Sequence, residues 1–284
     1  MAKKQEEKSL KFSVLISIYY KENPKFCDLA LKSILIDQTV KPDEVLIVKD
    51  GELTDELEKV LQKYVDKFPK VIKFLAFKKN QGLGMALQKG LEKCKYNIVM
   101  RMDTDDVACK YRFEKQLNYM KQHPEVSVVG SAIGEFVDSP KEKLRMKNMP
   151  LSYEEVVSYS KFRNPLNHMT VCFRKNDILE VGNYKPLMYL EDHYLWSRLL
   201  VSGKKIENLP NVLVKVRIGN GFYERRGNKQ YLSGWKFLQN YLYENKYITF
   251  MQKLRNKLGM LVIIYCPEWA RKILYNKILR KGSV

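Results

Sequence analysis

The stretch SVLISIYYKENPKFCDLALKSILIDQTVKPDEVLIVKDG, residues 13–51, decides the fold of this chain. Two apolar segments, FSVLISIY at 12–19 and EVLIVKDG at 44–51, have the length and β-branched content of buried strands. Between them, Asn23 followed by Pro24 is typical of a helix start, with Asn as the cap and Pro in the first turn. The stretch therefore predicts a strand, a helix and a second strand.

The same alternation continues along the first half of the chain. Helical patterns at 56–68, 82–94 and 110–122 alternate with strand patterns at 71–77, 96–102 and 126–136. Strands and helices that alternate with short connections favour a mostly parallel central sheet flanked by helices. Beyond residue 140 the pattern is irregular, apart from a helix near 190–202. Ligands bind beyond the carboxyl ends of parallel strands, so Asp50 and the acids after residue 102 should line one crevice.

Composition limits the class of protein. The five cysteines are widely spaced and form no CxxC pair, which argues against a disulfide framework and a zinc site and for a reducing compartment. The charged start of the chain lacks the apolar core of a signal peptide. No apolar run approaches the ~20 residues that a transmembrane helix needs. These features predict a cytoplasmic protein.

The charge is strongly basic and unevenly distributed. The chain carries 51 Lys and Arg residues against 32 acids, a formal net charge of +19. Residues 201–284 hold 17 of the basic residues and only four acids, a net charge of +13. Such an excess indicates a polyanionic partner, which could be nucleic acid, a phosphorylated ligand or an anionic lipid headgroup.

Three carboxylates crowd the end of the strand expected at 96–102. Asp103, Asp105 and Asp106 fall within four positions of the stretch NIVMRMDTDDVACK. Carboxylates this close raise one another's pKa unless a cation neutralises them. Mg²⁺ or Mn²⁺ accepts one or two carboxylates and leaves its other positions to water and phosphate. The alternative is a helix N-cap, but three acids exceed what a cap requires. We therefore predict a site for a metal and a diphosphate.

The ordered motifs resemble a known family. The stretch 13–51, KNQGLGMALQKGL, DTDD and EDHYLW are together similar to inverting glycosyltransferases of family 2, which have the GT-A nucleotide-sugar fold. The resemblance covers roughly residues 12–235. The additional motifs VKDG, NPLNHMTV and ERRG resemble bacterial enzymes that build capsule, exopolysaccharide or O-antigen repeats on lipid carriers.

The resemblance also implies a division of the chain. Residues 1–11 would be a charged leader and residues 12–235 the GT-A domain. Within that domain, residues 12–110 would form the nucleotide-binding half and residues 111–235 the acceptor half. Residues 236–284 would form a basic amphipathic helical extension that associates with a membrane.

On the donor side, the resemblance assigns roles residue by residue. Asp50 matches the aspartate that binds the uracil ring of a UDP-sugar, although a turn residue before Gly51 is the alternative. The nucleotide pocket would further include Ser17, Tyr19, Gly82 and Thr104. Asp103, Asp105 and Asp106 match the DxD-type element that reaches the ribose and the metal on the diphosphate.

On the acceptor side, Glu191 and Asp192 match the family's acidic base, with Asp192 as the first choice. Their alternative role is to cap the following helix. His168 would lie near the donor diphosphate or the acceptor, unless it is a core histidine. Arg225 and Arg226 could neutralise the charge of the leaving UDP or bind a lipid diphosphate, or they could be solvated surface charges.

The end of the chain predicts membrane contact. In CPEWARKILYNKILRK, residues 266–281, the apolar side chains recur at helical spacing and the basic ones fall largely elsewhere. This pattern indicates an amphipathic basic helix in a membrane interface. An ordinary helix packed on the domain is the alternative. Membrane contact would suit an acceptor that is linked to a polyprenyl diphosphate.

The functional hypothesis is an inverting, metal-dependent glycosyltransferase at the inner face of the cell membrane. The resemblance implies that it transfers galactose or an N-acetylhexosamine from a UDP-sugar to a lipid-linked or glycan acceptor. A nucleotidyltransferase would need a phosphate-binding loop near the N-terminus, which SVLISIYYKENPK does not resemble. A nucleic-acid-binding protein is suggested by charge alone, and no binding motif supports it. A GxGxxG motif is absent after the first strand, which argues against a Rossmann dehydrogenase.

Overall fold

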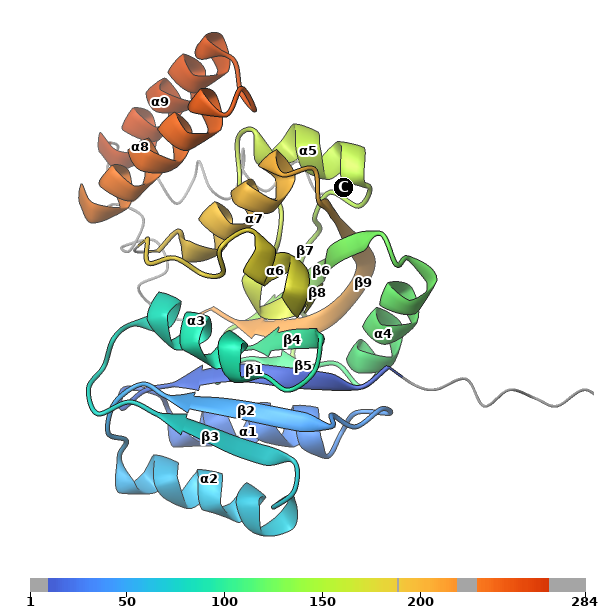
Figure 1. Ribbon diagram of the computed structural model, residues 1–284. Coiled ribbons are helices and arrows are strands. Elements are labelled where there is room, and N and C mark those ends of the chain that lie inside the picture. The colour runs from blue at the N-terminus through green and yellow to red at the C-terminus, as the bar shows by residue number, and fades with distance from the viewer. Residues whose placement is uncertain (1–9, 188, 219–228, 266–284) are drawn as a thin grey trace, which may run out of the picture.

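The computed structural model describes residues 10–187, 189–218 and 229–265, which form a curled sheet covered by helices (Figure 1). The strands are β1 (Phe12–Ile18), β2 (Glu44–Lys49), β3 (Ile72–Ala76), β4 (Ile98–Met102), β5 (Val107–Ala108), β6 (Val126–Phe136), β7 (Arg145–Lys147), β8 (Cys172–Arg174) and β9 (Lys205–Arg217). The helices are α1 (Pro24–Leu35), α2 (Asp55–Lys67), α3 (Leu83–Lys93), α4 (Arg112–Gln122), α5 (Tyr153–Ser160), the 3₁₀ turn η1 (His168–Thr170), α6 (Lys175–Glu180), α7 (Glu191–Val201), α8 (Lys229–Glu244) and α9 (Phe250–Tyr265).

The sheet is parallel in its first half and mixed in its second. Its order is β3-β2-β1-β4-β8-β6-β9-β5, with β7 paired to β6. β1, β2, β3 and β4 are parallel neighbours, because α1, α2 and α3 provide the long crossovers that parallel pairs need. Beyond β4, the short strand β8 runs antiparallel to both β4 and β6, whereas β9 runs parallel to β6. The expectation of a mostly parallel sheet thus describes the part of the sheet formed by β1, β2, β3 and β4.

The start of α1 is as predicted. The Asn23 side chain accepts a hydrogen bond from the backbone N–H of Lys25 at 2.9 Å, and Pro24 is the first helical residue. The next helix, α2, is capped in the same way by Thr54, which accepts from the backbone N–H of Leu57. These caps satisfy backbone donors that a helix start leaves free, so they determine where each crossover helix begins.

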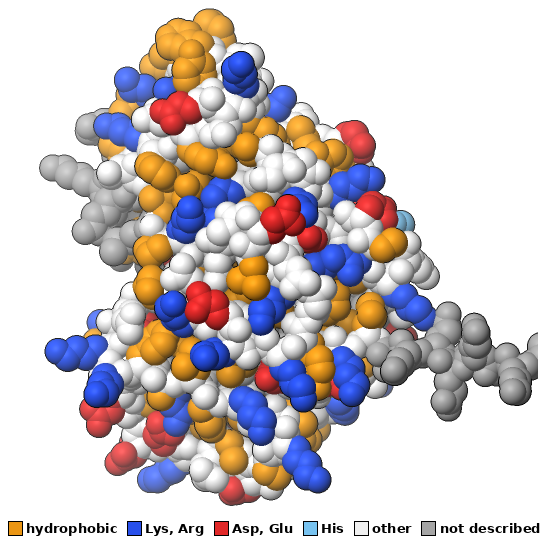
Figure 2. Space-filling view, viewed as in Figure 1, with side chains coloured by type: hydrophobic (Ala, Val, Ile, Leu, Met, Phe, Trp, Pro, Cys, Tyr) orange, Lys and Arg blue, Asp and Glu red, His pale blue; other side chains and the backbone are white. Residues whose placement is uncertain are grey.

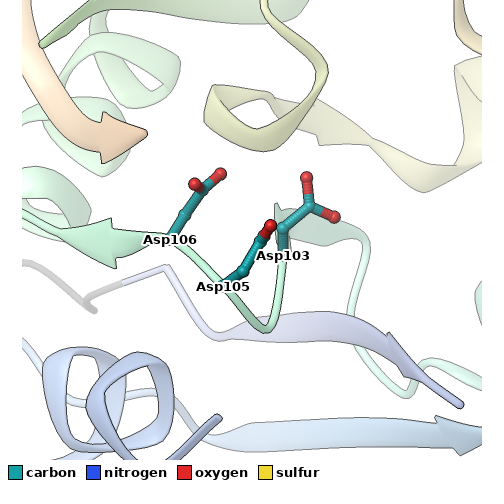
Figure 3. A group of neighbouring side chains, drawn as sticks. All are labelled: Asp103, Asp105 and Asp106. Atoms are coloured by element: carbon teal, nitrogen blue, oxygen red, sulfur yellow. The ribbon is translucent and has the colours of Figure 1, made fainter. Parts of the chain in front are cut away.

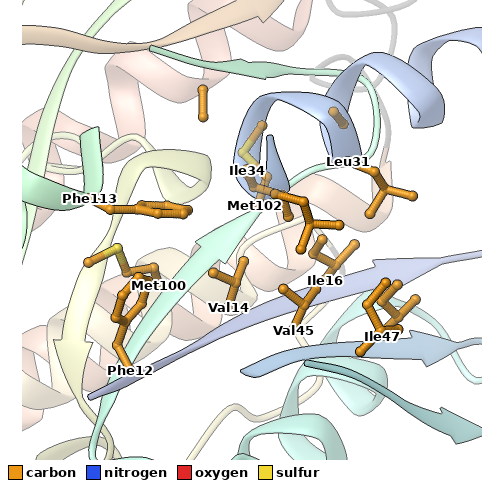
Figure 4. Close-up of a cluster of buried hydrophobic side chains, with 14 of the residues drawn as sticks. Phe12, Val14, Ile16, Leu31, Ile34, Val45, Ile47, Met100, Met102 and Phe113 are labelled. Atoms are coloured by element: carbon orange, nitrogen blue, oxygen red, sulfur yellow. The ribbon is translucent and has the colours of Figure 1, made fainter. Parts of the chain in front are cut away.

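Two apolar cores lie on the two faces of the sheet. Along β1, Val14 and Ile16 point into the core formed with α1, α2 and α4 (Figure 4), whereas Leu15 points into the core formed with α3, α6 and α7. Helix α3 approaches the second face closely, because a Cβ on Gly90 would lie 2.6 Å from the Leu15 side chain. Trp196 is fully buried in this second core.

The last two described helices form an antiparallel pair beside the sheet domain (Figure 1). Leu238 and Leu242 of α8 and Ile248 pack against Tyr194 of α7. The predicted boundary after residue 235 falls inside α8, and the division into domains stays a prediction. Within the described ranges, no helix combines the length and the apolar character needed to cross a membrane. The amphipathic helix predicted at 266–281 lies outside the described residues, as does most of the leader.

Candidate active site

A cleft of about 530 Å³ opens at the carboxyl ends of β1, β2 and β4. It brings together eight of the residues singled out in the sequence: Ser17, Tyr19, Asp50, Gly82, Asp103, Thr104, Asp105 and Glu191. The expectation of one crevice is therefore confirmed for Asp50, Asp103 and Asp105, whereas Asp106 is buried and does not line the cleft. The physical reason is that parallel strands present their carboxyl ends at one edge of the sheet.

The acidic cluster follows β4 directly (Figure 3). One carboxylate oxygen from each of Asp103, Asp105 and Asp106 lies within 4.8 Å of the others. Burial and the neighbouring charge of Asp103 raise the pKa of Asp105 to about 6. Burial and the two neighbouring carboxylates raise the pKa of Asp106 well above its usual value. An oxygen-only donor set of this kind fits Mg²⁺ or Mn²⁺, whose charge would relieve the repulsion.

The helix-cap alternative for this cluster is wrong. The residues after Asp106 form β5, and α4 starts only at Arg112, after the N-cap residue Tyr111. Asp106 instead accepts a hydrogen bond from the backbone N–H of Arg217 at 3.0 Å, which joins the cluster to the end of β9. The backbone therefore directs the three carboxylates toward one another rather than toward a helix terminus.

Arg101, which the sequence analysis did not single out, is the fixed countercharge of the cluster. It comes from β4, is only 3% exposed, lines the cleft and forms an ion pair with Asp103. Burial lowers the pKa of Arg101, but the charge and hydrogen bond of Asp103 together with Tyr184 and Asp106 outweigh this effect and leave the pKa raised. Its Nε has no hydrogen-bond partner among the residues that the structure describes. The signal in the sequence was an arginine inside the otherwise apolar strand IVMRM.

Asp50 both lines the cleft and orders a neighbouring loop. Its two carboxylate oxygens accept the backbone N–H groups of Gln81 at 2.7 Å and Gly82 at 2.9 Å. The adjacent Gly51 has a φ of +94°, and a Cβ there would lie 2.9 Å from the backbone N of Asn80. Asp50 therefore has the turn role that the sequence left open, and it also has a position on the cleft.

Glu22 is a second residue that the sequence analysis missed. It lies between β1 and α1, lines the cleft and is hydrogen-bonded to the Thr104 side chain. Burial raises its pKa to about 7, and the charges of Asp105 and Asp103 contribute to the increase. No local sequence pattern identifies Glu22, because its proximity to the acidic cluster exists only in the folded chain.

Glu191 and Asp192 begin α7 but face different surroundings. Glu191 lines the cleft, its Oε2 is buried without a hydrogen-bond partner, and burial raises its pKa to about 7. Asp192 is not among the residues that line this cleft, and its Oδ2 accepts a hydrogen bond from Nδ2 of Asn164 at 2.7 Å. Burial also raises the pKa of Asp192. The N-cap residue of α7 is Leu190, so the pair does not provide an N-cap side chain.

The remaining predicted residues lie elsewhere. His168 is buried behind the cleft, where its Nε2 is 3.0 Å from the Tyr184 hydroxyl and its ring contacts Trp196 edge-on. Burial, with a smaller effect of Arg101, lowers the pKa of His168 well below its usual value, so its environment is that of a neutral core histidine. Arg225 and Arg226 fall outside the described residues.

Comparison with known sequences adds a family and named relatives. A family model described as "Glycosyl transferase family 2" matches residues 13–181. The amylovoran biosynthesis glycosyltransferase AmsE of Erwinia amylovora is 42% identical over 229 residues, 81% of this chain and 82% of that protein. The UDP-Gal:alpha-D-GlcNAc-diphosphoundecaprenol beta-1,3-galactosyltransferase of Escherichia coli is 36% identical over 274 residues, 95% of this chain and 97% of that protein.

Comparison with solved structures shows the same fold at low sequence identity. The S. aureus protein TarS aligns with a TM-score of 0.64 and 17% identity over 96% of this chain and 46% of that chain. A mannosyltransferase from Pyrobaculum calidifontis, solved in complex with GDP-Man and Mn²⁺, aligns with a TM-score of 0.62 and 15% identity over 92% of this chain and 72% of that chain.

Proposed function

The chain belongs to glycosyl transferase family 2 and has the GT-A fold, and we propose that it is an inverting enzyme that transfers a sugar from a UDP-sugar to a lipid-linked acceptor. Its relatives are glycosyltransferases of bacterial polysaccharide biosynthesis. The observation that carries the proposal is the cleft itself, in which Asp50, Asp103 and Asp105 lie at neighbouring strand ends, with the carboxylate of Asp106 beside them.

The proposed donor is UDP-galactose, with a UDP-N-acetylhexosamine as the second choice. The E. coli relative is named as a UDP-Gal enzyme, and TarS has been solved in complex with UDP-GlcNAc. In our proposal Asp50 accepts the imide N–H of uracil, since each carboxylate oxygen has a second lone pair besides the one used by the loop amides. Ser17 and Tyr19, at the end of β1, would line the rest of the nucleotide pocket.

Members of this family generally depend on a divalent metal, and we propose Mn²⁺ or Mg²⁺ for this chain. Asp103, Asp105 and Asp106 would hold the ion, which supplies positive charge to the diphosphate leaving group. Arg101 keeps Asp103 in place from the side of β4. Because the Arg101 guanidinium is buried and paired with Asp103, it restrains the carboxylate of Asp103 and leaves those of Asp105 and Asp106 available to the ion.

The base of the reaction belongs, in this proposal, to the pair Glu191 and Asp192. A carboxylate removes the proton of the acceptor hydroxyl. The oxygen of that hydroxyl bonds to the anomeric carbon, while the bond from this carbon to the UDP oxygen breaks on the opposite face. Asp192 remains our first choice, because Asn164 and the backbone N–H of His193 hold its carboxylate in one orientation. Glu191 has the position on the cleft.

We propose a polyprenyl-diphosphate-linked sugar as the acceptor. The E. coli relative is named for a diphosphoundecaprenol-linked acceptor and aligns over 95% of this chain. An enzyme that uses such a substrate has to meet it at a bilayer, so we place the protein at the inner face of the cell membrane. Arg225 and Arg226 remain candidates for binding the lipid diphosphate.

The experiment that tests this proposal is a calorimetric titration of UDP into the protein, with Mn²⁺ and again with EDTA. We expect binding with Mn²⁺ that is weakened strongly by EDTA and by Asp103→Ala or Asp105→Ala. Asp66→Asn is the matched control, because Asp66 is an exposed aspartate on α2. Transfer from UDP-galactose to a diphosphate-linked N-acetylglucosamine acceptor, followed by mass spectrometry, then tests the donor. An affinity for UDP that is unchanged by EDTA and by the aspartate substitutions would refute the assignment of the metal site.

A further inference from the structure

Helix α9 presents an apolar surface that the described fold leaves uncovered. Met251, Leu254, Leu258 and Val262 recur every three or four residues, so they lie on one face of the helix, and Met251 reaches 70% exposure. The exposed ring of Phe250 begins the same face and contacts the ring of Tyr243 on α8. We refer to Met251, Leu254, Leu258 and Val262 as the α9 stripe. A contiguous exposed apolar face, as opposed to scattered apolar residues, is typical of a site that contacts a protein or a membrane.

The α9 stripe is bordered by positive charge. Helical geometry places Arg255 on one side of it and Lys257 on the other, and residues 245–262 include four basic residues and no acid. The Arg255 guanidinium lies over the ring of Phe162 at 3.8 Å. Figure 2 shows hydrophobic side chains gathered at the end of the molecule formed by α8 and α9, with Lys and Arg side chains beside them.

The opposite face of α9 is the one that holds the helix to the domain. Met260 is buried together with Trp235 of α8 and Leu190. Leu190 directly precedes the Glu191–Asp192 pair, and Leu187, which packs on the same cluster, lines the cleft. Packing thus uses the other face of α9, which leaves the stripe uncovered by the described residues, and the helix pair packs against the rim of the active-site cleft.

We propose that the α9 stripe binds the surface of a bilayer that contains anionic phospholipid, with the helix lying in the plane of the interface. The apolar side chains of the stripe would contact the acyl chains of the lipids. The basic side chains on both sides of the stripe would contact the negatively charged headgroups. A second copy of the chain is a poorer occupant, because a twofold contact would bring the like-charged flanks together. Docking of this kind would hold the rim of the cleft beside a lipid-linked acceptor, and its role in the reaction therefore rests on the proposed function.

The test is co-sedimentation of the full chain with vesicles of phosphatidylglycerol mixed with phosphatidylethanolamine. We expect the double variant Leu254→Gln/Leu258→Gln to lower the vesicle partition coefficient by about tenfold or more, because two buried apolar side chains are removed. Arg255→Gln/Lys257→Gln should weaken binding to these vesicles and reduce its dependence on salt. Met146→Gln on β7 is the matched control, since Met146 is 54% exposed and Leu258 is 56% exposed. Equal partition of wild type, Met146→Gln and the leucine double variant would overturn the proposal.

Two further readouts separate this inference from the proposed function. The leucine double variant should keep metal-dependent UDP binding and transfer to a short-chain, water-soluble acceptor, while losing rate on a vesicle-embedded acceptor. Vesicle binding through the stripe without any UDP binding would refute the proposed function and leave the docking surface standing. If sedimentation equilibrium showed a wild-type dimer that the double variant dissociates, and vesicles did not bind, the stripe would be an interface between copies and the proposal would be overturned.

Discussion

Replacing Asp105 by Asn should make the metal-free protein more stable at neutral pH, although it removes a predicted metal ligand. In the folded protein the pKa of Asp105 is raised from 3.8 to about 6, chiefly by burial and then by the charge of Asp103. The ionised form of Asp105 is therefore less stable in the folded protein than in the unfolded chain. A change of about two pKa units corresponds to about 3 kcal/mol. Because the carboxylates share the repulsion, we expect Asp105→Asn to raise the free energy of unfolding by about 1–3 kcal/mol.

The sign of this effect fixes its pH dependence. A carboxyl group whose folded pKa is raised destabilises the protein only where it ionises, so the loss of stability begins near pH 4 and is complete above about pH 6. Urea unfolding in EDTA should therefore show a gain for Asp105→Asn near pH 7.5 and almost none near pH 4. In saturating Mn²⁺ and UDP the wild type should instead be more stable than Asp105→Asn. A ligand at 100 times its Kd stabilises the protein that binds it by about 2.7 kcal/mol.

Asp66→Asn is the control, because it removes an exposed aspartate that lies outside the cluster. Its stability should follow that of the wild type at both pH values. An Asp105→Asn variant that gained nothing near pH 7.5, or gained equally near pH 4, would refute the reasoning that crowded, buried charge destabilises this site.

Other variants test the rest of the site. Asp192→Asn should lower kcat by about 100-fold or more while leaving UDP binding intact, as measured by steady-state kinetics and calorimetry, and Glu191→Gln should lower it less. Arg101→Met removes the buried partner of an ion pair whose other partner, Asp103, is 29% exposed, and should lower the free energy of unfolding in urea by about 1–3 kcal/mol without metal, with partial recovery when Mn²⁺ neutralises the acids. Gly90→Ala would place a Cβ 2.6 Å from a core leucine and should destabilise by about 1–3 kcal/mol in the same assay, whereas Gly259→Ala on α9 meets nothing within 4 Å and should be neutral or stabilising.

Each of these predictions has an outcome that contradicts it. A larger loss of kcat in Glu191→Gln than in Asp192→Asn would move the base to Glu191, the residue on the cleft. An Arg101→Met variant as stable as wild type in EDTA would show that Arg101 is not the countercharge of the cluster. Equal stability of the two glycine variants would mean that α3 can move away from the sheet at little cost.

The first half of the chain could be predicted because its signals are local. The cap of α1 is made by Asn23 and the N–H of Lys25, two residues away, and the apolar runs of β1 and β2 are contiguous. The acidic cluster was predictable for the same reason, since the three acids follow one strand. In contrast, the long strand β9 was expected only as irregular short pieces, because its parallel pairing with β6 joins residues about 80 apart.

The site residues that were missed show the same limit. Glu22 is hydrogen-bonded to the Thr104 side chain, and the residues next to Glu22 in the sequence give no indication of this contact. Arg101 lies two residues before Asp103, but its place in a buried strand gave no sign of which way the guanidinium would turn.

By itself, the sequence determined the strand–helix–strand unit, the position of the acids at the strand ends and the family, because each depends on short-range periodicity, capping or ordered motifs. Only the tertiary structure decided that Arg101 neutralises Asp103, that Glu191 rather than Asp192 lines the cleft, and that the stripe on α9 stays uncovered. The physical reason is that side-chain direction and burial follow from contacts between distant segments, which exist only once the chain has folded.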